Sequence, residues 1–350
     1  MRLKRAVSEN RKTTSSAASY ALTALLLGCA PTANKAPTTP DPRLDVQATP
    51  PPAKAAPAGS PRVREAEALL AKGDAVGARN KFEAALAETP RDVRAWLGMG
   101  LSYEALGDEK QAERAYRSAL EVDANFAEAH NNIGLLLRDR GDAQGAIREL
   151  EAAVAADPKL ASAQTNLALT LEEAGKKEEA ARAYARAVKL APKDAMLRAN
   201  HGLFLLSTGE GAAALSELRA GLANAGEDRA ALVALGNGLR RAGKPDEAVR
   251  ALRQAIEGGD GKPTPALLSE LALAQNAADD AAGAKASLNE ALALDARYAT
   301  AHYLLGSIEA ANGDAKAAKT HYERCIQLDP RGPLASKAKE KLAALKQAKK

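Results

Sequence analysis

Histidines and cysteines are the residues of this chain that could bind a metal or act as nucleophiles. The chain has four histidines and two cysteines. Two zinc ligands on one face of a helix are typically four residues apart, and no two of the histidines have that spacing. We therefore expect no metal site at these positions: His130, His201, His302 and His321.

The remaining catalytic patterns are also absent from the sequence. The glycines are spaced regularly and form no phosphate-binding loop, and neither a serine elbow nor a Cys/His arrangement is present. Cys325 lies among small packing residues, which predicts a buried thiol without a disulfide partner. We expect no enzymatic activity, no catalytic residue, no cofactor and no small-molecule substrate.

Two series of side chains recur at one fixed interval along the chain and could bind a polypeptide. A side-chain amide both donates and accepts hydrogen bonds, so equally spaced asparagines suit the backbone of an extended peptide, whatever its sequence. A strip of leucines would add an apolar wall. Structural roles between neighbouring helices are open for both series, which are Asn132, Asn166 and Asn200, and Leu101, Leu135, Leu169 and Leu203.

These series belong to a repeat that begins near residue 59. If each repeat is numbered from 1, position 8 is glycine or alanine, and position 24 is large and apolar. Position 27 is small, and position 15 is glycine in all repeats but one, which has Asp279. Position 20 is alanine in every repeat, at Ala78, Ala112, Ala146, Ala180, Ala214, Ala248, Ala284 and Ala318.

The pattern predicts two antiparallel helices in each repeat. Small residues at positions 8, 20 and 27 allow helices to cross closely, and the large residue at position 24 fills the space beside them. Glycine at position 15 ends the first helix because it can adopt a left-handed conformation. Proline at position 32 of several repeats stops the second helix. One repeat cannot bury its apolar face alone, but stacked neighbours can.

This sequence resembles the tetratricopeptide repeat family, whose period of about 34 residues matches the spacing of the alanines at position 20. The resemblance implies an all-α solenoid, a right-handed superhelix of about eight helix-turn-helix repeats over residues 59–332. Residues 333–350 are predicted to form a capping helix with a basic tail. Two extra residues between Gly258 and Pro263 interrupt the period, which indicates either a bend or a longer loop.

The family resemblance also implies that the first helices line a concave groove that binds proteins. The three asparagines resemble the ladder with which the repeats of O-linked N-acetylglucosamine transferase hydrogen-bond an extended peptide. The lysine and asparagine pattern of dicarboxylate-clamp domains cannot be placed on this sequence, so capture of a terminal carboxylate is not expected.

The N-terminus reads as an export signal. Basic residues precede an apolar run that is too short for a good membrane-spanning helix, which needs about 20 residues. The run ends in Leu26-Leu27-Gly28-Cys29, which resembles the lipobox of bacterial lipoproteins. The resemblance implies a signal peptide over 1–28 and a lipidated Cys29. Residues 29–58, rich in Pro, Ala and Thr, are predicted to be a disordered linker. An aspartate directly after the cysteine resembles an inner-membrane retention signal, and this chain has Ala30 there. We therefore expect the protein to be anchored in the outer membrane and to face the periplasm.

Charge argues against nucleic acid as a partner. The chain has a formal net charge of +5, but residues 59–332 carry 35 basic and 40 acidic side chains. We therefore expect a lipid-anchored envelope protein that acts as a protein-binding scaffold or assembly factor. The alternatives are a non-catalytic accessory subunit that recruits a cell-wall or polysaccharide enzyme, and an assembly lipoprotein of type IV pili or gliding motility.

Overall fold

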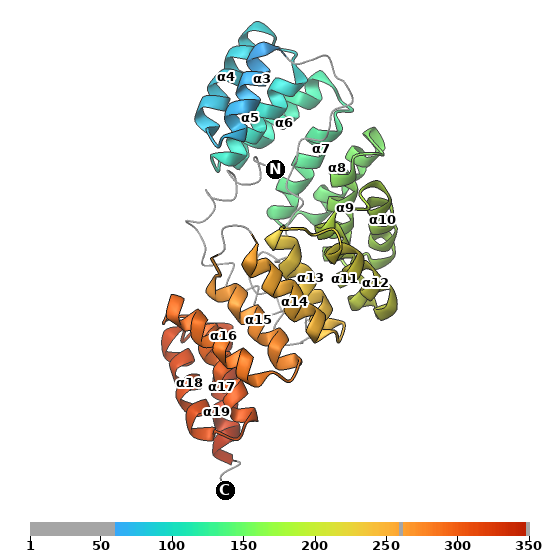
Figure 1. The fold of residues 1–350 in the computed structure, drawn as a ribbon. Coiled ribbons are helices and arrows are strands. Elements are labelled where there is room, and N and C mark those ends of the chain that lie inside the picture. The colour runs from blue at the N-terminus through green and yellow to red at the C-terminus, as the bar shows by residue number, and fades with distance from the viewer. Residues whose placement is uncertain (1–59, 259–261, 348–350) are drawn as a thin grey trace. The chain divides into compact units, whose positions relative to one another are not determined.

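The computed structural model describes residues 60–258 and 262–347, and in these ranges the chain is helical without strands. The helices follow one another as eight pairs and a final helix (Figure 1). This confirms the predicted all-α solenoid fold. The pairs are α3 (Pro61–Ala71) and α4 (Ala75–Glu88), α5 (Val93–Ala105) and α6 (Glu109–Val122), α7 (Ala127–Asp139) and α8 (Ala143–Ala156), α9 (Ala161–Glu173) and α10 (Lys177–Leu190), α11 (Ala195–Thr208) and α12 (Gly211–Leu222), α13 (Arg229–Arg241) and α14 (Pro245–Glu257), α15 (Pro265–Ala277) and α16 (Ala281–Leu294), and α17 (Ala299–Ala311) and α18 (Ala315–Leu328), followed by α19 (Pro333–Gln347).

The turn between the two helices of each pair is left-handed at position 15, as the glycine pattern predicts. Gly73, for example, has a φ of 85°, and Gly107 has a φ of 79°. Asp279 holds the same place in the seventh pair with a φ of 61°, and it is the one non-glycine residue with positive φ in the described ranges. A side chain at this angle is strained, so the seventh turn is the least favourable of the series.

The small and large positions of the repeat meet where helices cross. A Cβ atom added to Gly134 would lie 2.7 Å from Cγ of Leu150, so position 8 is filled by the side chain at position 24 of the same pair. Gly98 is covered instead by the ring of Phe82 from the preceding pair, at 2.1 Å from an added Cβ. The alanines at position 20 are fully buried. Small residues thus set how closely the helices approach.

The chain divides into two compact units at Pro192. In unit 1, which we define as the described residues 60–192, buried residues form three apolar clusters along the four helix pairs. Phe82 and Tyr116 are among the largest side chains of these clusters. Each cluster joins residues of successive helices, so neighbouring repeats share one core.

Unit 2 comprises the described residues from Lys193 onward and contains two larger clusters. One cluster includes Leu252 of α14 and Leu271 of α15, so apolar packing continues across the interruption of the repeat period. At the C-terminal end, α19 packs against α17 and α18, where it buries Leu334 and Ala338 (Figure 1).

Within the described ranges, none of the helices combines the length and the apolar composition that crossing a membrane would require.

Candidate functional site

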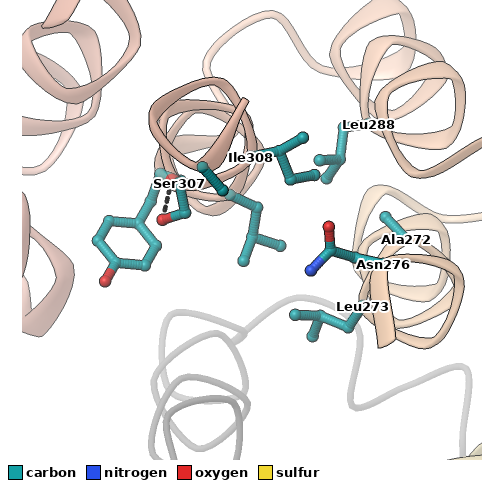
Figure 2. Close-up of a pocket in the computed structure, with 9 residues that line it drawn as sticks. Ala272, Leu273, Asn276, Leu288, Ser307 and Ile308 are labelled. Atoms are coloured by element: carbon teal, nitrogen blue, oxygen red, sulfur yellow. Dashed lines mark hydrogen bonds between the residues drawn. The ribbon is translucent and has the colours of Figure 1, made fainter. Parts of the chain in front are cut away.

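A hollow on the first helices of unit 2 is the main candidate binding site. It has a volume of about 190 Å³ and lies between α15 and α17, with Leu288 of α16 at its base. Most of its lining is aliphatic. Figure 2 shows the side-chain amide of Asn276 pointing toward Ile308 across the hollow, with Leu273 below it. The hollow is smaller than a typical small-molecule pocket, and its apolar lining with a few polar groups at the edge suits a single apolar side chain of a partner.

The polar edge of this hollow comes from two side chains. Asn276 is exposed and can both donate and accept hydrogen bonds. The Ser307 hydroxyl donates to the carbonyl of Tyr303 at 3.0 Å (Figure 2). It also accepts from the Tyr322 hydroxyl at 3.2 Å, so it is held in place by its own helix and by α18. The amide of Asn276 is therefore the group at this edge with the most freedom to bind a ligand.

A buried polar cluster lies on the same set of first helices, on α15 and its neighbour α13. Glu270 of α15 is only 2% exposed, and Ser269 beside it is fully buried. Burial raises the pKa of Glu270 to about 7, although the Arg240 guanidinium and the Asn237 amide act to lower it. A carboxyl group is thus kept close to its point of ionisation at neutral pH.

Several atoms of this cluster lack hydrogen-bond partners among the described residues. They are Oε2 of Glu270, Nε of Arg240 and Oδ1 of Asn237. Buried polar atoms are nearly always paired, so such atoms mark a place for water or for groups of a ligand. Two of these atoms accept hydrogen bonds and one donates.

The asparagine series is buried in both units. In unit 1, Asn132 is 3% exposed and Asn166 is fully buried. The Asn166 amide donates to Oδ1 of Asn131 at 2.9 Å, and the Asn131 amide donates to Oδ1 of Asn132 at 3.1 Å. Asn132 also hydrogen-bonds the hydroxyl of Tyr116, whose pKa is raised well above the ordinary value by burial and by Glu104. These bonds join α6, α7 and α9.

Some atoms of the asparagine series have no partner in the described residues. Oδ1 of Asn166 and both amide atoms of Asn200, a buried residue of unit 2, are without hydrogen bonds. The series therefore combines a structural network at Asn132 with unpaired groups at the other two residues. Peptide binding by these asparagines stays a prediction.

The leucine series is covered to different degrees. Leu101 is partly buried and packs against two clusters of unit 1, and Leu135 is also partly buried. Leu169 of unit 1 and Leu203 of unit 2 are buried. Leu273 holds the same repeat position in the seventh pair, and it lines the hollow of unit 2. An apolar contact surface is thus found in a later repeat than the leucines that the sequence singled out.

Three of the four histidines lie at positions 4 and 23, which can touch each other within one repeat. Nδ1 of His130 lies 2.7 Å from Oε2 of Glu149, and Arg198 pairs in the same way with Glu217. In the eighth repeat these positions are His302 and His321, whose Nδ1 atoms are 3.1 Å apart. Partners so distant in the sequence can be recognised only once the repeat is known to be a helical hairpin.

His201 and Cys325 have buried surroundings. Burial lowers the pKa of His201, although the Glu217 carboxylate acts to raise it. Cys325 is fully buried, as the sequence predicts, and burial raises the pKa of its thiol to about 11. A thiol with this pKa is a poor nucleophile at neutral pH. In the described part of the chain, no three His, Cys, Asp or Glu side chains are grouped closely enough to hold a metal ion. Cys29, the predicted lipidation site, lies outside the described residues.

Comparison with protein families identifies the repeat. Four models, each described as a tetratricopeptide repeat, match residues 69–133, 161–194, 231–264, and, for the fourth, both 127–160 and 299–331. Among curated protein sequences, none matches the chain.

The chain is similar to several solved structures at low sequence identity. A chain of the APC/C hetero-tetramer Cut9–Hcn1 is 18% identical with a TM-score of 0.56 over 79% of this chain, which spans 55% of that chain. PilF of Pseudomonas aeruginosa is 19% identical over 72% of this chain and 100% of its own, with a TM-score of 0.47. A tetratricopeptide repeat protein of Parabacteroides merdae is 16% identical over 81% of this chain and 97% of its own, with a TM-score of 0.41.

Proposed function

Because the chain is built of tetratricopeptide repeats, which generally mediate protein–protein interactions, we propose that it is a non-catalytic scaffold of the bacterial envelope. The hollow between α15 and α17 carries this proposal. Its aliphatic lining suits one apolar side chain of a partner, and the amide of Asn276 can hydrogen-bond the backbone beside that side chain. The partner is a protein segment, bound on the first helices of unit 2.

The polar cluster extends the proposed contact beyond one side chain. Ser269 and Glu270 belong to the same helix as Leu273, and Asn237 and Arg240 belong to the neighbouring first helix, α13. Ser269 and Glu270 are buried, so a segment that places an apolar side chain in the hollow meets their polar groups only where the side chains that cover them move aside.

The experiment is co-purification of the full-length protein from cross-linked cells of its source. We expect Leu273→Arg to remove the partner because a charged side chain would enter the apolar hollow. Leu294→Arg is the matched control, since Leu294 of α16 is 54% exposed and lies away from the hollow. Equal recovery of the partner with wild type and with both variants would contradict the proposal.

The second part of the proposal is attachment to the outer membrane through lipid on Cys29. It is supported by the basic and apolar run that leads to Leu26-Leu27-Gly28-Cys29, and by the Pro-rich segment that follows. A protein of this type carries more than one acyl chain, which is enough for stable anchoring.

Cys29→Ser tests the anchor. We expect the wild type in the membrane fraction, with an acylated N-terminal residue by mass spectrometry, and the variant unacylated and released from the membrane fraction. Wild-type protein that is cleaved elsewhere, or that carries no acyl group, would show this part of the proposal to be wrong without affecting the partner site.

A further inference from the structure

The pair His302 and His321 differs from the other contacts between positions 4 and 23. Both rings are half-buried in the last repeat, on α17 and α18, and their centroids are 5.4 Å apart with an angle of 35° between the ring planes. The Nδ1 atoms approach to 3.1 Å. In this contact the Nδ1 atom of each ring faces the Nδ1 atom of the other ring, and neither faces a carboxylate.

The orientation of His302 is set by a backbone carbonyl. In two other repeats, position 4 faces the carbonyl at position 32 of the preceding repeat: the Trp96 indole N–H donates to Pro90 at 2.9 Å, and Nε2 of His130 lies 3.1 Å from the carbonyl of Ala124. His302 makes the equivalent bond to Ala296. With the proton on Nε2, Nδ1 of His302 carries a lone pair, which points toward His321.

Both imidazoles are kept neutral by their surroundings. Burial lowers the pKa of each ring, and His321 and Arg324 further disfavour a charge on His302. The Glu309 carboxylate acts in the opposite direction on His321, but it also forms an ion pair with Lys285 at 3.3 Å. Neutral imidazole is the form that binds transition metals, and a carbonyl that holds the other ring nitrogen is the usual support of a metal-binding histidine.

Although the spacing of the histidines along the sequence predicts no metal site, we propose from this contact that His302 and His321 together bind one divalent transition-metal ion through their Nδ1 atoms. With metal–nitrogen bonds of about 2.05 Å, a separation of 3.1 Å corresponds to an N–metal–N angle of roughly 98°, between square and tetrahedral geometry. The ion would lie to one side of the line between the nitrogens, so each ring must turn toward that side. Water fills the other coordination positions, since the described residues bring no third protein ligand to the pair.

The binding step conserves protons. In the metal-free pair, His321 donates its Nδ1 proton to Nδ1 of His302. On binding, that proton moves to Nε2 of His321 through solvent, both Nδ1 lone pairs bond the ion, and water leaves the ion.

Imidazole ligands favour copper, nickel and zinc over magnesium or calcium. Arg324 is a nearby cation that opposes binding, whereas Glu309 is a nearby anion that favours it.

The repeats themselves supply variants that preserve the fold. Position 23 is alanine in the second and fourth repeats, at Ala115 and Ala183, so His321→Ala introduces a residue that the array already tolerates there. Position 4 is Gln164 in the fourth repeat, so His302→Gln removes the other ligand in the same way. His130→Gln is the matched control because His130 faces Glu149 instead of a second imidazole.

The test is calorimetric titration of the full-length protein, without a histidine tag, with Ni²⁺, and with Mg²⁺ as the comparison ion. We expect one Ni²⁺ site in the wild type and in His130→Gln, at least tenfold weaker binding in His321→Ala and in His302→Gln, and no detectable Mg²⁺ binding. Circular dichroism checks that the variants are folded. Ni²⁺ affinity unchanged in both His321→Ala and His302→Gln, or no binding by the wild type, would overturn the proposal.

Discussion

At the scale of single residues, Asp279 is the clearest point of backbone strain. Its φ of 61° is the angle that glycine adopts in the other turns between helix pairs. We expect Asp279→Gly to raise the free energy of unfolding by up to about 1 kcal/mol, because glycine has no Cβ to strain at this angle. Ala278→Gly is the control: its φ is −91°, so glycine there should lower stability by a similar amount. Urea unfolding followed by circular dichroism measures both, and a loss of stability in Asp279→Gly would contradict this account.

Glu270 predicts a dependence of stability on pH. Its pKa of about 7 in the folded chain lies above the ordinary value of 4.5. The folded state therefore binds more protons between these values, so the wild type loses stability as pH rises from about 4.5 to 7. We expect Glu270→Gln to stabilise the protein at pH 8, by at most about 3 kcal/mol, and to have little effect at pH 4.

The measurement for Glu270 is thermal unfolding across this pH range. Glu290→Gln, at an exposed position of α16, is the charge-matched control. If the stability difference between Glu270→Gln and the wild type is the same at pH 4 and pH 8, the buried carboxyl does not titrate as described.

The sequence predicted some residue roles and missed others for physical reasons. A buried Cys325 and left-handed glycines follow from position in the repeat, because each depends on local backbone and size. The contact of His302 with His321, and the electrostatic interaction of Glu270 with Arg240, join different helices. Partners this far apart in the sequence give no signal unless the crossing of those helices is already known.

At the scale of the helices, Gly98 tests how closely successive pairs must approach. An added Cβ would lie 2.1 Å from the ring of Phe82, which is fully buried and cannot move into solvent. We expect Gly98→Ala to lower stability by about 1–3 kcal/mol through overpacking. Gly211→Ala is the control, because nothing lies within 4 Å of its added Cβ at the start of α12. The Gly211→Ala variant should be more stable than the wild type by about 0.4–1 kcal/mol.

Chemical denaturation of both alanine variants measures this difference. Equal stability of Gly98→Ala and the wild type would mean that the helices can separate at little cost. The helices themselves were predictable, since residue size and glycine placement recur with a fixed period. The degree of burial of Asn132, Asn166 and Leu169 was not, because it depends on how neighbouring first helices pack rather than on any one repeat.

At the scale of the whole molecule, the apolar hollow and the polar cluster both belong to unit 2. The sequence directed attention to residues 101–203, where asparagine and leucine recur regularly. The hollow instead follows from an irregular part of the array, in which position 9 is Leu273 and then Ser307, and position 12 is Asn276. Regular positions mainly build the solenoid, and departures from regularity give its surface distinct binding properties.

The most direct test of partner binding by unit 2 is photo-crosslinking in cells, with the reactive residue placed at Asn276 or at Glu290. Both positions are exposed, but Asn276 lines the hollow and Glu290 lies on the second helix, α16. The account predicts that one defined envelope protein is captured from Asn276, that Leu273→Arg abolishes this capture, and that Glu290 captures none of it. Capture of the same protein from Glu290 but not from Asn276 would contradict the account.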